Sequence, residues 1–140
     1  MQMEYAVVII ILVIVAFLWG KADDKNREVE IDKIFEGRTS LSPREFYQKY
    51  YSNQAVPENT VLDIINILEE ELETDLSRLI PSDDFSDNLR YLFEFDSMAD
   101  VGVVESVEQK FSIKITDSEA ENIKTINDLI VFVSNKVNCT

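Results

Sequence analysis

The sequence predicts an all-α protein, namely a small helical bundle preceded by a single transmembrane helix. Residues 5–20 (YAVVIIILVIVAFLWG) form an uncharged, almost wholly apolar run. Downstream, apolar residues recur at spacings of three and four, which is the period of amphipathic helices. Several of these stretches follow helix-capping patterns. We expect a transmembrane anchor at 1–20, a linker with a short aromatic helix at 21–56, and one helical domain at 57–140.

The apolar run indicates a membrane anchor. It is slightly shorter than the roughly 20 residues that a bilayer crossing needs, but Tyr5 and Trp19 at its ends suit the headgroup level. A cleaved signal peptide is the alternative, and it calls for Lys or Arg before the run and small residues after it. Glu4 precedes the run and Gly20-Lys21 follows Trp19, so the pattern favours an uncleaved anchor.

Basic residues predict the orientation of this anchor. Lys21, Lys25 and Arg27 follow the run, and no Lys or Arg precedes it. The positive-inside rule then places the downstream domain in the cytoplasm. The predicted localisation is the cell membrane, single-pass, with the N-terminal helix as the membrane contact.

The charge is concentrated in the C-terminal part. The chain has a formal net charge of -14, and residues 57–140 hold 19 acidic and 6 basic residues. Such a domain repels nucleic-acid phosphates, so we expect no nucleic-acid partner. It attracts basic protein surfaces.

The composition leaves little chemistry to the chain itself. There is no histidine, and the single cysteine is Cys139. Disulfides within the chain, Cys/His zinc sites and histidine-based triads are therefore excluded. No glycine-rich phosphate loop or nucleophile elbow is present. We expect no catalytic residue, no metal site and no enzyme.

The linker carries one clear helix start. Residues 21–41 are polar and predict a tether that is helical near 29–35. Ser42-Pro43-Arg44-Glu45 combines an N-cap serine, a proline at the first helical position and a glutamate three residues after the cap. The aromatic residues at 46–51 then pack on the downstream domain or form a functional platform.

Two helices and a long connection follow. Pro57 opens a helix expected at 58–75, whose buried stripe is Val61, Ile64, Ile65, Leu68 and Leu72. Residues 77–95 form a connection with a helical turn at 88–93. A third helix is expected to begin at Ser97, with an apolar face of Met98, Val101, Val104, Val107 and Phe111.

Capping boxes mark the two remaining segments. Thr116 with Glu119 begins a short piece, and Thr125 with Asp128 begins the final helix. The expected buried stripe of that helix is Ile126, Leu129, Ile130, Val133 and Val137.

Residues 96–133 (DSMADVGVVESVEQKFSIKITDSEAENIKTINDLIVFV) carry a resemblance to a known family. The stretch joins Asp96-Ser97-Met98 to Glu108-Gln109-Lys110-Phe111, then Ile113-Lys114-Ile115 and Thr125-Ile126, in an unbroken order. In this it resembles the acyl carrier proteins, the phosphopantetheine-binding carrier domains, over roughly residues 58–137. The resemblance implies an acyl-carrier-like helical bundle.

The resemblance implies a function as well. Ser97, which follows Asp96 in the Asp-Ser-Met motif, would carry 4′-phosphopantetheine. A phosphopantetheinyl transferase would attach this group. The partners would be acyl- or aminoacyl-handling enzymes with basic docking surfaces, meeting Asp100, Glu105 and Glu108. The chain would be a membrane-tethered acyl or peptidyl carrier that presents a thioester.

Three positions depart from the family pattern. The usual Asp-Leu-Gly before the serine is replaced by Asn88-Leu89-Arg90, and four extra residues, 91–94, follow. Gly102 stands where carriers commonly have an acidic docking residue.

Alternative interpretations remain beside this one. Ser97 to Asp100 is itself a capping-box pattern, so Ser97 either caps its helix or is left free by Asp96 as the cap. The alternative function is an unmodified, carrier-like interaction module that uses its acidic helix. Asp83, Asp84 and Asp87 could be read as a calcium loop, but the required spacing and glycine are missing.

Overall fold

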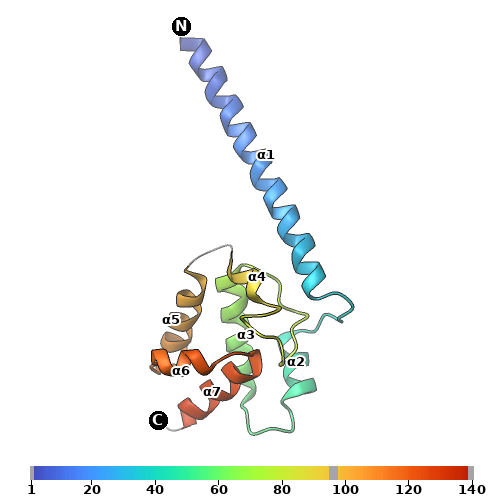
Figure 1. Cartoon of the computed structure of the whole chain (residues 1–140), viewed down its shortest axis with the longest axis vertical. Helices are drawn as coiled ribbons and strands as arrows, with labels where there is room; N and C mark the ends of the chain where they lie inside the picture. The colour runs from blue at the N-terminus through green and yellow to red at the C-terminus, as the bar shows by residue number, and fades with distance from the viewer. Residues whose placement is uncertain (1, 95–97, 139–140) are drawn as a thin grey trace. The chain divides into compact units, whose positions relative to one another are not determined.

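The computed structural model describes the backbone of residues 2–94 and 98–138, with side chains except at 2–5 and 17–26. Within these residues the regular secondary structure is all-α, as predicted. The β-structure in this part of the chain is limited to an isolated bridge between Asp84 and Thr125. The helices are α1 (Gln2–Ile34), α2 (Pro43–Tyr50), α3 (Glu58–Leu72), α4 (Arg90–Phe93), α5 (Ala99–Phe111), α6 (Asp117–Asn122) and α7 (Ile126–Asn138) (Figure 1).

The chain divides into two compact units, Met1–Glu36 and Gly37–Thr140. The first contains α1, and the second contains all the other helices. Gly37 lies at the junction with φ +78, a backbone conformation that residues with a side chain rarely adopt. The second unit therefore begins well before residue 57, where we predicted the start of the helical domain.

The membrane predictions need correction. Among the residues that the structure describes, no helix is long and apolar enough to cross a membrane. The uncharged run of α1 has 16 residues, which is about 24 Å of helix against a hydrocarbon core of about 30 Å. The predicted transmembrane anchor is therefore not supported, and the predicted single-pass localisation in the cell membrane is wrong.

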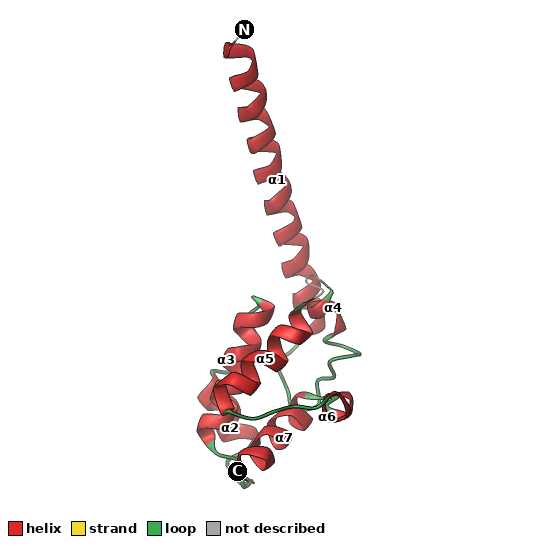
Figure 2. Cartoon of the chain, turned by 90° about the vertical axis from the view of Figure 1, so that its left-hand side faces the viewer, coloured by secondary structure: helices red, strands yellow, loops and turns green. Residues whose placement is uncertain are grey.

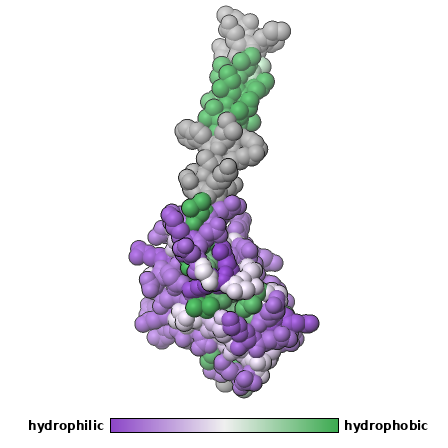
Figure 3. Space-filling view, turned by 90° about the vertical axis from the view of Figure 1, so that its right-hand side faces the viewer, coloured by the Kyte–Doolittle hydropathy of each residue, from purple (hydrophilic) through white to green (hydrophobic). Residues whose placement is uncertain are grey.

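The apolar side chains of α1 are nonetheless uncovered. The large hydrophobic residues from Val7 to Val15 are 39–63 % exposed, and Figure 3 shows them as a green band along this helix. The helix also continues to Ile34, which agrees with the predicted helix near 29–35, but residues 21–28 of the predicted tether are helical as well. Residues 21–34 include no glycine or proline, and Lys33 pairs with Glu30 one turn away, which favours a continuous helix.

α3 is the central helix of the second unit. It packs against α2, α5 and α7, and Figure 2 shows α5 alongside it. Its predicted stripe is buried throughout, at Val61, Ile64, Ile65, Leu68 and Leu72. The helix starts at Glu58 as predicted but ends at Leu72, three residues early, because Glu73 adopts the left-handed conformation with φ 48.

α2 is an integral part of this unit. Ser42 and Glu45 form the predicted capping box, with Pro43 in the first turn. Phe46 and Tyr51 are 3 % and 0 % exposed, so these aromatic side chains pack on the domain. The Tyr51 hydroxyl donates to Asn127 Oδ1 at 2.8 Å, and burial raises its pKa to about 12.

The C-terminal helices begin where the capping patterns predict. Thr116 and Glu119 form a capping box at α6, and Thr125 and Asp128 exchange the same pair of hydrogen bonds at α7. Lys136 of α7 donates to Glu119 Oε2 at 2.8 Å, which holds the pKa of Glu119 below its usual value. This ion pair joins α6 to α7.

Candidate functional site

Two of the predicted site residues, Asp96 and Ser97, lie outside the described residues. The structure describes the helix that follows them. α5 begins at Ala99, two residues later than predicted, and Met98 occupies the N-cap position without a side-chain capping hydrogen bond. The N–H groups of this first turn point towards the preceding residues, as they do at any helix start. Attachment at Ser97 stays a prediction.

The faces of α5 differ from the predicted ones. Ala99, Val103 and Val107, which are spaced by four residues, are buried. Met98 and Val101, which we assigned to the apolar face, are 60 % and 42 % exposed. The prediction is wrong at these two positions, because α5 packs on α3 through the face that contains Ala99, Val103 and Val107. The start of α5 thus presents apolar side chains at the surface.

A pocket of about 760 Å³ lies beside α5 and is also lined by residues of α4, α6 and the start of α7. This volume falls in the range of small-molecule sites. Aliphatic side chains from α5 and from the segment leading into α7 dominate its lining, and charged groups stand among them. The lining residues are Phe85, Ser86, Phe93, Asp100, Val101, Val103, Val104, Glu105, Val107, Glu108, Ile115, Asp117, Ala120, Glu121, Ile123, Lys124 and Leu129.

Two aromatic rings form one wall of this pocket. Phe85 of the connection and Phe93 of α4 meet edge to face, with ring centroids 5.8 Å apart. Val101, which is one of the exposed residues in the first turn of α5, also lines the pocket. The pocket therefore reaches from the beginning of α5 to the connection that precedes it.

The three predicted docking carboxylates all line this pocket but differ in their bonding. Asp100 and Glu105 are exposed. Glu108 is half-buried, and its Oε2 accepts a hydrogen bond from the Ile115 N–H at 2.9 Å. Glu108 thus fixes the segment between α5 and α6, and Asp100 Oδ1 accepts from the Val101 N–H at 2.9 Å in the first turn of α5. The side chains of Asp100 and Glu105 are nonetheless exposed, so a partner can reach them. Docking by these residues stays a prediction.

Asp83 is the centre of a buried polar cluster in the connection before α4. Its side chain is 1 % exposed. Its Oδ2 accepts from the Ile80 N–H at 3.0 Å and from Arg38 Nη1 at 2.8 Å. Its Oδ1 accepts from Asn88 Nδ2 at 2.7 Å, while Asn88 Oδ1 accepts from the Asp84 N–H at 2.8 Å. We call Arg38, Asp83 and Asn88 the loop cluster.

The aspartates of this connection have partners other than a metal ion. Asp83 bonds Arg38 and Asn88, and the Ser86 hydroxyl donates to Asp84 at 2.8 Å. That hydrogen bond holds the pKa of Asp84 below its usual value. Among the residues that the structure describes, no group of three or more His, Cys, Asp or Glu side chains could hold a metal ion.

Gly102 of α5 leaves space for the end of the Glu71 side chain from α3. A Cβ at this position would collide with the Glu71 carboxylate. Glu71 Oε1 accepts from the Ser106 hydroxyl at 2.6 Å. The glycine that departs from the carrier pattern thus makes room for a carboxylate from the neighbouring helix.

Sequence reasoning missed Arg38 and Glu71. Arg38 lies 45 residues from Asp83, and Glu71 lies 35 residues from Ser106. No local spacing pairs them, because periodicity and capping patterns extend over only about four residues. The departures at Asn88 and Gly102 were visible signals, but their partners were not.

The amino-acid sequence of this chain is similar to those of known proteins over most of the second unit. The sequence profile of the family described as phosphopantetheine attachment site matches residues 62–133. The chain is 32 % identical over 71 residues to the acyl carrier protein of Thermosynechococcus vestitus, covering 51 % of this chain and 83 % of that protein. It is 32 % identical over 79 residues to the acyl carrier protein of Myxococcus xanthus, covering 56 % and 95 %.

Fold and comparisons together define a small helical carrier domain, a class that holds a group for other proteins. The chain belongs to the phosphopantetheine-binding family of acyl carrier proteins. Its cofactor is 4′-phosphopantetheine, as predicted. Because such carriers leave the chemistry to their partners, the prediction that this chain is not an enzyme is confirmed.

Proposed function

We propose that this protein carries acyl groups on a 4′-phosphopantetheine arm attached at Ser97 and presents them to partner enzymes. The pocket beside the first turn of α5 is the observation that carries this proposal. It is about 760 Å³ in volume, and its lining combines aliphatic and aromatic side chains with six charged ones. The arm, when bound, supplies a thiol that holds the cargo as a thioester.

The residues around the start of α5 suit such an arm. A phosphodiester next to a helix N-terminus is stabilised by backbone N–H groups and by the positive end of the helix dipole. Ala99 is the first helical residue and Met98 is the N-cap, so Ser97 precedes the N-cap by one residue in the sequence. The exposed side chains of Met98 and Val101 offer apolar contacts near the same place.

The pocket favours an acyl cargo over an aminoacyl or peptidyl one. Burying apolar surface contributes about 25 cal/mol per Å², and the side chains of Val101, Val104 and Ile123 offer such surface. A free amine or a peptide would lose hydrogen bonds to water there, and restoring them requires polar partners. The charged lining residues, which are Asp100, Glu105, Glu108, Asp117, Glu121 and Lys124, suit the polar end of an acyl group or of the arm.

Partner recognition follows from charge. Asp100 and Glu105 are exposed carboxylates next to the pocket, so they suit the basic rims of a phosphopantetheinyl transferase and of acyl-handling enzymes. Glu108 contributes charge but is held by Ile115. The alternative, an unmodified interaction module, would use the same carboxylates without the arm, and the family match does not favour it.

Intact mass tests the proposal. Incubating the full chain with coenzyme A and a broad-range phosphopantetheinyl transferase should add roughly 340 Da, the mass of the arm with its phosphate. Ser97→Ala should abolish the gain. Ser118→Ala, at an exposed serine in the first turn of α6, should leave it intact. A chain that gains no mass supports the unmodified module, and a gain that survives Ser97→Ala moves the attachment elsewhere.

A further inference from the structure

Arg38 connects the segment before α2 to the connection that leads towards the attachment site. Its Nη1 donates to Asp83 Oδ2 at 2.8 Å and to the Arg78 carbonyl at 3.4 Å. The arginine side chain is 25 % exposed, and that of Asp83 is 1 % exposed. Residue 38 also lies outside the matched span of 62–133. This contact is therefore an addition of this chain to the carrier domain.

The buried carboxylate makes this contact consequential. Breaking a buried ion pair by removing one partner is costly because an uncompensated charge remains. Asp83 keeps hydrogen bonds from the Ile80 N–H and from Asn88 Nδ2. Both of those donors are neutral, so Arg38 is the cation that compensates the charge in the loop cluster.

The loop cluster fixes the connection that leads into α4. The Asp83 carbonyl accepts from the Ile126 N–H at 3.0 Å, which ties the connection to the start of α7. Asn88 Oδ1 accepts from the Asp84 N–H, and the Leu89 N–H donates to the Asp84 carbonyl. The chain then enters α4 at Arg90. The geometry of residues 83–89 thus depends on the hydrogen bonds of the loop cluster, including the one that Arg38 donates to Asp83.

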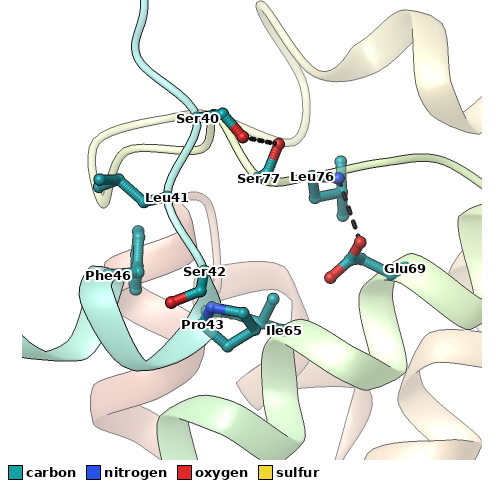
Figure 4. A pocket seen from close by; sticks show the side chains of 9 residues that line it. All are labelled: Ser40, Leu41, Ser42, Pro43, Phe46, Ile65, Glu69, Leu76 and Ser77. Atoms are coloured by element: carbon teal, nitrogen blue, oxygen red, sulfur yellow. Dashed lines mark hydrogen bonds between the residues drawn. The ribbon is translucent and has the colours of Figure 1, made fainter.

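The segment around Arg38 is held by polar contacts more than by packing. The Leu41 N–H donates to the Ser77 carbonyl at 2.7 Å, and the Ser40 hydroxyl donates to Ser77 Oγ at 2.7 Å. A cavity of about 340 Å³ interrupts the apolar packing between this segment, α2 and α3 (Figure 4). Glu69 faces this cavity, and burial raises the pKa of its carboxyl.

We propose that Arg38 is a positioning residue for loading of the arm. Through Asp83 and Asn88 it holds the connection 83–94 in the arrangement that a transferase must meet in order to reach the attachment residue. The proposal rests on the proposed function, because it assumes that Ser97 takes the arm. A purely stabilising role of the ion pair is the competing explanation.

Transfer kinetics on the full chain separate these explanations. We compare wild type, Arg38→Met and Arg38→Lys as substrates of a broad-range phosphopantetheinyl transferase with coenzyme A, at a temperature where each is folded by circular dichroism. Arg38→Met should lower kcat about tenfold, since small misplacements of reacting groups are costly. KM for the carrier should stay within about twofold, because docking by Asp100 and Glu105 is untouched. Arg38→Lys should recover most of the loss.

Arg44→Met is the matched control. Arg44 pairs with Glu58 at 3.1 Å, but its side chain is 72 % exposed, so its removal should change neither kcat nor stability appreciably. Equal kcat values for wild type and Arg38→Met would overturn the proposal. An equal loss in Arg38→Met and Arg44→Met would overturn it as well.

A double variant keeps the test decisive if Arg38→Met unfolds. Arg38→Met with Asp83→Asn removes both charges and should restore much of the stability. Under the proposal, loading of this double variant stays slow because the contact itself is missing. Full recovery of kcat along with stability would show that only charge compensation matters, and the proposal would fall.

Amide hydrogen exchange separates failure of this inference from failure of the proposed function. In Arg38→Met, exchange at residues 84–94 should rise by about tenfold or more relative to Arg44→Met, while α3 is unchanged. A wild-type chain that never accepts the arm would refute the proposed function. The exchange rates would then still show whether Arg38 orders residues 84–94. Unchanged exchange at 84–94 would refute the positioning role.

Discussion

Asn88 shows at the scale of one residue why this chain departs from the carrier pattern. Its amide nitrogen donates to the buried Asp83 carboxylate, while its amide oxygen accepts from the Asp84 N–H. A side-chain amide offers its donor and its acceptor on two separate atoms and keeps both at every pH. The aspartate found in related carriers would here place two carboxylates in contact. The departure thus follows from Asp83.

We therefore expect Asn88→Asp to destabilise the protein. At pH 7 the free energy of unfolding should fall by about 3 kcal/mol, since a buried donor is replaced by a like charge. The loss should shrink near pH 4, because one carboxyl of the pair is then protonated and can donate to the other. Urea denaturation of the full chain at both pH values measures this.

Asn53→Asp is the control for this substitution. Asn53 is exposed, so the same chemical change there should alter the free energy of unfolding by no more than about 0.5 kcal/mol. If Asn88→Asp behaved like Asn53→Asp at pH 7, the loop cluster would not have the energetic role described above.

At the scale of elements, three residues form a polar contact between α3 and α5 beside the apolar one. Glu71 of α3 lies over Gly102 of α5 and accepts from Ser106 one turn further on. The glycine costs about 1 kcal/mol relative to alanine in a helix interior, and the hydrogen bond to a charged group offsets that cost. The two effects are coupled because one carboxylate takes part in both.

The effect of Gly102→Ala on the free energy of unfolding should therefore depend on whether residue 106 is serine or alanine. In the wild type the added methyl group displaces Glu71 from Ser106, and the gain in helix propensity is cancelled or exceeded. In Ser106→Ala the Glu71 side chain is free to move away, so Gly102→Ala should be about 1 kcal/mol more favourable than in the wild type. A double-mutant cycle by urea denaturation gives this coupling, and additive effects would contradict it.

The helix starts that carry a capping box were predicted correctly, whereas the buried face of α5 was not. Ser42, Thr116 and Thr125 each begin a helix as predicted, because a capping box uses only residues within one turn. The buried face of α5 was predicted wrongly, since Met98 and Val101 are as apolar as Val103 and Val107. Which valine side chains of α5 are buried depends on how α5 packs against α3.

At the scale of the whole molecule, the second unit includes the segment before the matched family span. Phe46, Tyr51 and Val56 are buried in it, and Arg38 contacts Asp83. The predicted domain start at residue 57 leaves all four residues out. We propose instead that the folding unit begins at residue 37, which is where the second compact unit starts.

A chain of residues 57–140 should accordingly be less stable than one of residues 37–140. The difference should be at least about 3 kcal/mol, the cost of losing one buried aromatic side chain from a core. Gln48→Ala with Lys49→Ala in the longer chain alters only exposed positions of α2 and should change stability by less than about 0.5 kcal/mol. Equal denaturation midpoints for the two chain lengths would favour the start at residue 57.

The sequence alone determined the helical class, the acidic character, the capped helix starts and the family, because these depend on composition and on residues a few positions apart. It did not determine the length of α1, for which a run of 16 uncharged residues was taken as an anchor. Only the tertiary structure paired Arg38 with Asp83 and Glu71 with Ser106, and only it selected the buried face of α5. These contacts join segments 35–45 residues apart, and which distant side chains meet is decided by packing around α3.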